Sequence, residues 1–449
     1  MQKNKYEIDM CQGTIMDKLI TFALPLMLSG ILQLMFNAVD IIVVGRFSGS
    51  QELAAVGSTT ALINVFTNLF IGISLGSNVL AARLYAAGKE KEMSEVVHTS
   101  IAMALVSGVV MGIIGVLFAG PALEVMGTPE DVIGQSVLYM RIYFLGMPFF
   151  MLYNYGAAIL RAVGDTRRPL IFLVISGCIN AGLNLFFVIA LHMGVAGVGI
   201  GTVISQFVSC VLVLRCLHRS ETCYQLHFSG LKMQKKYLWQ IFRVGVPAGI
   251  QSMVINFSNA LLQSSVNSFG SIAMAGYTAA NNLLGFLYVS VNAVTQACMS
   301  FTSQNYGAGK YKRMDRVLAD CMILSVGVAL VLGCAAYFFG PQILQIYTDN
   351  SQVIGSGMEI LSITTIPYFL CGIMDLIPGA LRGVGCSAAP MILSVIGTVG
   401  TRIVWIYLLF PYHRSLFFLF ISYPGSWLFT ILMQVVCFYY VRKKTIKVL

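Results

Sequence analysis

Twelve apolar segments, each about 20 residues or longer, are the feature that most limits what this chain can fold into. A helix needs about 20 apolar residues to cross the roughly 30 Å hydrocarbon core of a bilayer. Only 10% of the residues are charged and 57% are hydrophobic, whereas soluble domains carry roughly 25% charged residues. We therefore predict an all-α membrane protein. Its twelve transmembrane helices are expected at residues 19–44, 54–80, 95–118, 134–160, 169–191, 195–217, 238–267, 274–300, 317–339, 355–381, 389–411 and 416–441.

Lysine and arginine residues in the short loops predict the orientation of these helices, because basic loops resist translocation. With the N-terminus in the cytoplasm, the opposite side shows only Arg46, Arg141 and Arg414. We therefore expect a multi-pass protein of the cell (inner) membrane with both termini cytoplasmic. The net charge of +10 is then a signal of topology. A nucleic-acid partner is not expected, because such a partner requires basic residues gathered on one folded surface.

The residue types that carry catalysis or bind metals form no recognisable pattern. The 11 cysteines contain no Cys-x-x-Cys pair, and the five histidines are dispersed along the chain. No phosphate-binding loop or glycine-rich dinucleotide turn follows a strand-like run. We expect that the protein is not an enzyme, that it has no cofactor, and that it is a monomer.

The chain resembles itself when it is shifted by about 221 residues, which indicates an internal duplication. Six of nine residues are identical between 85–93 and 306–314. The Leu-Arg-Ala-Val-Gly turn at 160–164 overlies Leu-Arg-Gly-Val-Gly at 381–385. In addition, Pro25 in the first span corresponds to Pro247 in the seventh at nearly the same shift.

The duplication predicts how the twelve helices are organised. Each half contains six spans, and an even number of spans returns the chain to its starting side. We therefore predict two parallel six-helix lobes related by a pseudo-two-fold axis along the membrane normal. The expected boundaries are an N-terminal lobe at 1–215, a cytoplasmic linker at 216–237 and a C-terminal lobe at 238–449. Such halves are typical of transporters that bind a substrate between or within them and open alternately to either side.

These motifs together resemble the multidrug and toxic compound extrusion (MATE) family over nearly the whole chain. The resemblance rests on the run from Pro25 to Gly45 with Asp40, on the loop at 84–88 with its copy at 305–309, and on the two Leu-Arg turns. It implies a multidrug efflux transporter that exports amphipathic, often cationic, xenobiotics or metabolites. It also implies antiport with inward H⁺ or Na⁺, so small-molecule substrates and the lipid bilayer are the expected partners.

Asp40 is the strongest candidate for a cation-coupling residue. An acid deep in an apolar helix costs at least about 2.5 kcal/mol, so something must compensate it. Helical rise places Asp40, Asn184 and Thr202 at a similar depth, with Asn180 one turn from Asn184 on the same face. Carboxylate, amide and hydroxyl oxygens suit a small hard cation such as Na⁺ or a protonation switch. The resemblance also places these four residues at cation-coupling positions of the family.

The identity of the coupling ion stays open at this point. Many members of the family carry an aspartate where this chain has Asn184, so the site has one negative charge fewer. This weakens the interpretation as a Na⁺ site and favours simple protonation of Asp40. A structural role is the alternative, because buried amides and hydroxyls also hold membrane helices together.

Other polar residues within spans are candidates for cavity lining or substrate contact, although helix packing explains amides equally well. By helical rise, Asp375 and Arg402 lie about 10 and 18 Å from the cytoplasmic ends of their spans, so a long arginine side chain can reach the acid. We predict an ion pair between them, with a substrate or gating role as the alternative. The full set of cavity candidates is Asn37, Asn256, Asn259, Gln263, Asn282, Asp375 and Arg402.

The leading interpretation is therefore a cation-coupled antiporter that works by alternating access. One alternative is a flippase for lipid-linked saccharide of the same superfamily, which typically needs a cationic central cavity and often extra spans. A membrane-embedded enzyme or channel is a further alternative. The duplicated halves and the lack of a catalytic motif argue against it.

Overall fold

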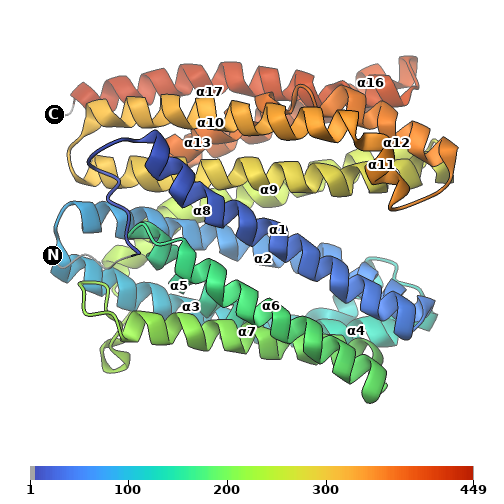
Figure 1. Cartoon of the computed structure of the whole chain (residues 1–449), viewed down its shortest axis with the longest axis horizontal. Coiled ribbons are helices and arrows are strands. Elements are labelled where there is room, and N and C mark those ends of the chain that lie inside the picture. Colours follow the sequence, from blue (N-terminus) through green and yellow to red (C-terminus); the bar gives the residue numbers. More distant parts are fainter. Residues whose placement is uncertain (1–5, 448–449) are drawn as a thin grey trace. The chain divides into compact units, whose positions relative to one another are not determined.

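The computed structural model describes residues 6–447, which form helices joined by short loops, without any strand in that range (Figure 1). The elements are α1 (Met16–Phe47), α2 (Ser50–Ala86), α3 (Glu90–Val125), α4 (Glu130–Leu145), α5 (Met147–Ala162), α6 (Arg167–Leu185), η1 (Phe186–Ala190), α7 (Gly194–His218), η2 (Phe228–Gly230), α8 (Lys235–Asn267), α9 (Ser271–Gly307), α10 (Tyr311–Phe338), α11 (Gly340–Gln345), α12 (Ser351–Thr364), α13 (Tyr368–Gly383), α14 (Ala388–Ser394), η3 (Val395–Gly400), α15 (Thr401–Val404), η4 (Trp405–Leu409), η5 (Phe410–Tyr412), α16 (Leu416–Phe420) and α17 (Ser422–Lys447). The all-α class is confirmed.

Each predicted span coincides with a helix or with consecutive helical segments. Nine spans of the described residues are long and apolar enough to cross a membrane, and two more are bent pairs, α4 with α5 and α12 with α13. The twelfth is α8, which has 33 residues but is not among these eleven, since amides such as Gln251 and Asn256 interrupt its apolar run. The twelve-helix fold class is therefore confirmed.

Two predicted spans are bent rather than straight. The axes of α4 and α5 differ by 45° and those of α12 and α13 by 51°. Pro148 lies in the first turn of α5, and Pro367 directly precedes α13. Proline lacks an amide hydrogen and its ring clashes with the preceding turn, so a continuous helix breaks there. This corrects the expectation of single continuous helices at 134–160 and 355–381.

Contacts divide the chain into two compact units. Unit 1 contains the described residues up to Asp9 and Leu28–Val246, and unit 2 contains Met10–Met27 and the described residues from Pro247 onwards. The predicted lobe boundaries stay a prediction, and the contact-based units differ from them in two segments. The start of α1, up to Met27, belongs to unit 2, and the predicted linker together with the start of α8 belongs to unit 1.

Buried aromatic side chains explain this grouping. Within unit 1, Tyr224 of the predicted linker is fully buried and donates a hydrogen bond to Glu7 Oε1 at 2.6 Å. Burial raises the pKa of the Tyr224 phenol, so it stays a protonated donor. Within unit 2, the ring of Phe22 packs edge-on against Phe301 with centroids 5.7 Å apart. The predicted linker is therefore a packed segment.

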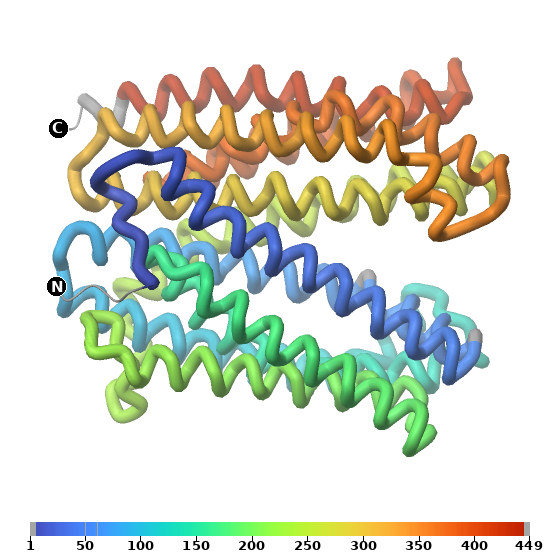
Figure 2. Tube along the Cα trace, in the orientation of Figure 1, coloured from blue at the N-terminus to red at the C-terminus, as the bar shows by residue number. Residues whose placement is uncertain are grey.

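The duplication is visible in the backbone of both units. Helices α2 and α9 each contain 37 residues, and each is followed by a tight turn into the next helix, α3 or α10, as Figure 2 shows. Gly88 in the first turn and Gly309 in the second have φ angles of 70° and 72°. Glycine adopts this left-handed conformation without strain, which explains why it occurs in both copies of the turn.

Small residues bring the helices of each unit into close contact. In unit 1, a Cβ atom on Gly108 of α3 would lie 2.5 Å from Cα of Pro148. In unit 2, a Cβ atom on Gly333 of α10 would lie 2.3 Å from the carbonyl oxygen of Thr365. Membrane helices depend on such packing because lipid tails are as apolar as the helices and provide no hydrophobic driving force between them.

Candidate functional site

Asp40 of α1 lies in a polar cluster with side chains of α6 and α7. Asn184 Nδ2 donates to Asp40 Oδ1 at 2.5 Å and to Asn180 Oδ1 at 3.4 Å. Asn180 Nδ2 donates in turn to Thr202 Oγ1 at 3.4 Å, and the Thr202 hydroxyl donates to the carbonyl oxygen of Val198 at 2.9 Å. The structure thus brings together, within unit 1, the four residues that the sequence analysis proposed for cation coupling. Below we call these four residues the Asp40 cluster.

Two glycines allow the three helices to approach at this point. A Cβ atom on Gly177 of α6 would lie 1.9 Å from the ring of Phe36, one turn before Asp40 on α1. A Cβ atom on Gly201 of α7 would lie 2.3 Å from Asn184 Oδ1. Any larger residue at either position pushes the helices or side chains apart, so the glycines set the geometry of the Asp40 cluster.

The Asp40 cluster contains an anion without a fixed counter-charge. Asn184 is fully buried, Asn180 is 6% exposed, and Asp40 is half-buried. None of the ion pairs among the described residues includes Asp40. The Asn184 amide supplies a hydrogen bond but no charge. A buried carboxylate needs a positive partner or a proton to offset its desolvation, and the described residues do not supply the positive partner.

A second atom of the Asp40 cluster also lacks a partner. Asn184 Oδ1 is buried and accepts no hydrogen bond from the described residues. Unpaired buried acceptors are rare in folded proteins, and each calls for an explanation such as a bound ion or water. The cluster thus has an uncompensated charge on Asp40 and an unused acceptor on Asn184.

Two tyrosines of α4 were not among the residues predicted from the sequence. Tyr139 is 7% exposed and Tyr143 is half-buried, and both interact electrostatically with Asp40. Their spacing of four residues places them on one face of a helix, which is the signal that identifies them as a pair.

The remaining amide candidates are not part of the Asp40 cluster. Asn37 is exposed one turn before Asp40, and the described residues form no hydrogen bond that links it to the cluster. In unit 2, Asn259 is half-buried and accepts a hydrogen bond from Arg402. The other three side chains are exposed on the surface of unit 2, namely Asn256, Gln263 and Asn282.

The predicted ion pair between Asp375 and Arg402 is wrong. Arg402 Nη1 instead donates to Asn259 Oδ1 at 2.9 Å, and Asp375 interacts electrostatically with Arg382. The helical rise correctly placed both residues in the interior, but depth alone does not define the face of a helix. Arg402 directly follows the π-helical turns of η3, Val395–Gly400, and each such turn rotates the residues after it relative to a regular α-helix.

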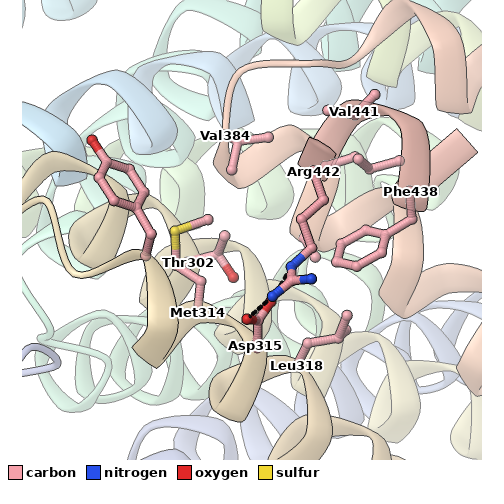
Figure 3. Close-up of a pocket in the computed structure, with 11 residues that line it drawn as sticks. Thr302, Met314, Asp315, Leu318, Val384, Phe438, Val441 and Arg442 are labelled. Carbon is pink, nitrogen blue, oxygen red and sulfur yellow. Dashed lines mark hydrogen bonds and ion pairs between the residues drawn. The ribbon is translucent and has the colours of Figure 1, made fainter. Parts of the chain in front are cut away.

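Unit 2 also contains a pocket that other residues line (Figure 3). Its walls are mostly apolar and include Leu318, Val384 and Phe438, and an ion pair between Asp315 and Arg442 crosses it. Both charged side chains are about two-fifths exposed, and exposed pairs of this kind contribute about 0–1 kcal/mol. The pocket contains none of the predicted site residues.

The described residues contain no group of three or more histidine, cysteine, aspartate or glutamate side chains positioned to hold a metal ion. Any cation bound at the Asp40 cluster would therefore rely on one carboxylate together with amide and hydroxyl oxygens. Hard cations accept such oxygen donors but require several of them at once.

The sequence matches the MatE family model twice, at residues 25–186 and 247–408. The two ranges begin at Pro25 and Pro247, the two prolines that the repeat aligned, which confirms the internal duplication. The chain is 30% identical over 433 residues to the probable multidrug resistance protein YoeA of Bacillus subtilis (strain 168), covering 94% of this chain and 93% of that protein. It is 24% identical over 392 residues to the probable multidrug resistance protein YpnP of the same organism, covering 86% and 87%.

The fold is similar to that of known structures as well. A crystal structure of MATE in complex with MaL6 has a TM-score of 0.90 at 20% identity and covers 99% of both chains. At this level of identity the similarity concerns the fold alone.

Proposed function

Because this chain belongs to the MatE family of multidrug efflux transporters, we propose that it exports amphipathic or cationic organic compounds in exchange for an inward-moving cation. One observation carries the proposal: Asp40 is a half-buried carboxylate in a membrane helix, hydrogen-bonded to a neutral amide and without a fixed counter-charge among the described residues. Ionisable residues inside membranes are expensive to maintain and mark ion or proton pathways. Asp40 is therefore the group to which the cation binds.

We propose H⁺ as the coupling ion. A hard cation such as Na⁺ needs several oxygen ligands, but the Asp40 cluster uses most of its oxygens internally. Asn180 Oδ1 accepts from Asn184, and Thr202 Oγ1 accepts from Asn180. Only one amide oxygen in the cluster, Asn184 Oδ1, accepts no hydrogen bond from the described residues. A proton needs a single acceptor, which Asp40 supplies.

Protonation of Asp40 changes the hydrogen bonds within the Asp40 cluster. Ionised Asp40 accepts a hydrogen bond from Asn184 Nδ2, whereas a protonated carboxyl group carries a donor of its own. Rotation of the Asn184 amide then presents Oδ1, the unused acceptor, to that donor. This exchange alters the link between α1 and α6. The altered link couples protonation of Asp40 to a change between two conformations of the transporter, provided that the proton and the substrate bind these conformations with different affinities.

The substrate path follows the polar face of α8 in this proposal. Asn256, Asn259 and Gln263 are spaced by three and four residues, so they share one face of the helix. Asn256 and Gln263 are exposed. Amides facing lipid are costly, so this face borders water and substrate. We further propose that the protein is a monomer in the cell (inner) membrane with both termini cytoplasmic.

Replacement of Asp40 by asparagine tests the proposal. In proteoliposomes with an imposed pH gradient and no Na⁺, the wild-type protein should transport ethidium, and Asp40→Asn should lose the gradient-driven transport. Asn37→Ala is the matched control, because Asn37 lies on the same helix one turn away and is exposed; it should keep the coupling.

A parallel experiment with a Na⁺ gradient and no pH gradient separates the two ions. Transport driven by Na⁺ alone would contradict proton coupling. Gradient-driven transport by a correctly inserted Asp40→Asn protein would contradict the role of Asp40 itself.

A further inference from the structure

The internal duplication identifies the part of unit 2 that corresponds to the Asp40 cluster. The family model matches residues 25–186 and again 247–408, so Pro25 of the first match corresponds to Pro247 of the second. In the same register Asn37 corresponds to Asn259, and Asp40 corresponds to Leu262. Asn180 corresponds to Arg402. Unit 2 therefore has a leucine where unit 1 has the acid, and a cation where unit 1 has a neutral amide.

Two of these residues of unit 2, Arg402 and Asn259, are in contact. Arg402 Nη1 donates to Asn259 Oδ1 at 2.9 Å. The guanidinium carbon lies 4.1 Å from the ring centroid of Tyr423. Arg402 is 2% exposed and Leu262 is fully buried. Corresponding positions of the two units thus carry different chemistry, with an acid and an amide in unit 1 and a leucine and a buried guanidinium in unit 2.

Arg402 holds a positive charge in this region of unit 2 without a carboxylate partner. The ion pairs among the described residues do not include it. An amide oxygen and the electron-rich face of a tyrosine ring stabilise it instead, and such rings attract cations at this distance. Arg402 Nε is buried and makes no hydrogen bond with the described residues. The guanidinium therefore occupies the region much as a bound cation would.

Asp375, one of the acids within the membrane segments of unit 2, has a fixed cation on its own helix. Asp375 of α13 interacts electrostatically with Arg382 of the same helix. Arg382 in turn donates from Nη2 to Gln251 Oε1 at 2.7 Å. Unit 2 thus has a fixed positive charge at the position that corresponds to Asn180 and another on the helix of Asp375, whereas no ion pair of the described residues includes Asp40 in unit 1.

We propose that Arg402 is a tethered cation that takes, in unit 2, the place of the mobile cation of unit 1, so that one cation moves per transport cycle through Asp40 alone. Arg402 thus determines the coupling ratio, which is the number of cations exchanged for each substrate molecule. The proposal rests on cation coupling at Asp40. Its physical basis is that like charges repel strongly in a low-dielectric interior, so a second mobile cation does not bind beside a buried guanidinium.

The coupling ratio of the wild-type protein is the first test. Proteoliposomes are prepared with the membrane potential clamped at zero, an inward proton gradient and an opposing gradient of ethidium. A ratio of one predicts that net ethidium flux stops when a roughly tenfold ethidium gradient balances a roughly tenfold proton gradient. Balance near a hundredfold ethidium gradient would mean two protons per cycle and would overturn the tethered-cation proposal. A complete lack of proton-driven flux would instead overturn the proposed function.

Substitution of Arg402 is the second test. Arg402→Lys keeps the charge and should keep transport at a ratio of one. Arg402→Met keeps much of the volume without the charge and should lose at least about tenfold in proton-driven ethidium transport. In Arg402→Ala, added guanidinium chloride should restore part of the transport, because it supplies the missing cation.

Wild-type transport rate and coupling by Arg402→Met would overturn the proposal, since a packing role does not require the charge. A lack of rescue in a folded, monodisperse Arg402→Ala protein would also count against it. The wild-type coupling ratio needs no variant, so the proposal is tested even where a substitution at this buried position prevents folding.

Discussion

The substitution Gly201→Ala tests whether the close approach of α6 and α7 sets the geometry of the Asp40 cluster. The added Cβ atom would lie 2.3 Å from Asn184 Oδ1, more than 1 Å closer than an ordinary van der Waals contact of 3.4 Å. Asn184 has no room to move toward Asp40, because their hydrogen bond is already 2.5 Å long. The amide must therefore rotate or the helices must separate.

Overpacking of this kind costs about 1–3 kcal/mol, which corresponds to a roughly 5- to 150-fold smaller population of the arrangement that holds Asp40. We expect the rate of proton-driven ethidium transport in proteoliposomes to decrease by a factor within that range, while the protein still folds. The matched control is Gly182→Ala. It lies on α6 two residues before Asn184, and a Cβ atom there meets no other atom within 4 Å. Transport by Gly201→Ala at the wild-type rate would refute the argument that this glycine sets the site.

Two further predictions concern stability, measured by thermal unfolding in detergent. Asp165 is fully buried, pairs with Arg168 and accepts two backbone N–H groups at 3.1 Å, so Asp165→Ala should destabilise the protein by about 3 kcal/mol or more. The exposed Asp131→Ala should change stability by less than about 0.5 kcal/mol, and similar losses in the two variants would contradict the argument. Gly309→Ala should cost about 1–2 kcal/mol, because φ is 72° and the space around it is open. Gly57→Ala, which also meets no other atom but lies within α2, should be neutral or stabilising, and an equal effect at both glycines would show that the left-handed turn is not the cause.

Much of the fold was predictable because a bilayer imposes simple rules on a sequence. Segment length identified the spans, and the shift of the chain against itself identified the duplication. The depth of each residue within the membrane was equally predictable, because every helical residue adds about 1.5 Å along the helix axis. That arithmetic placed Asp40, Asn184 and Thr202 at one level, and they do belong to one hydrogen-bonded cluster.

What the sequence did not reveal is the direction in which side chains point after a helix deviates from regular geometry. The pairing of Asp375 with Arg402 failed because depth does not specify the helix face, and because the π-helical turns of η3 precede Arg402. The bends before Pro148 and after Thr364 were missed for a related reason. Apolar length alone does not distinguish one straight helix from two bent ones, although proline supplies a cue.

The grouping of residues into units was also beyond sequence reasoning. Hydropathy marks where a helix begins and ends, but it does not show which neighbours its two halves contact. The first part of α1 packs in unit 2 and the remainder in unit 1. The polar segment at 216–237 looked like a linker, yet its buried Tyr224 and Leu226 anchor it within unit 1.

Reciprocal coupling is the most direct test of the central claim that Asp40 exchanges a proton for the substrate. If the two fluxes are linked, an ethidium gradient must drive protons in the opposite direction. Proteoliposomes that enclose a pH-sensitive dye are given an ethidium gradient without an initial pH gradient. We predict a pH change with the wild-type protein and none with a correctly folded Asp40→Asn protein. An equal pH change with both proteins would show that the proton moves by another route.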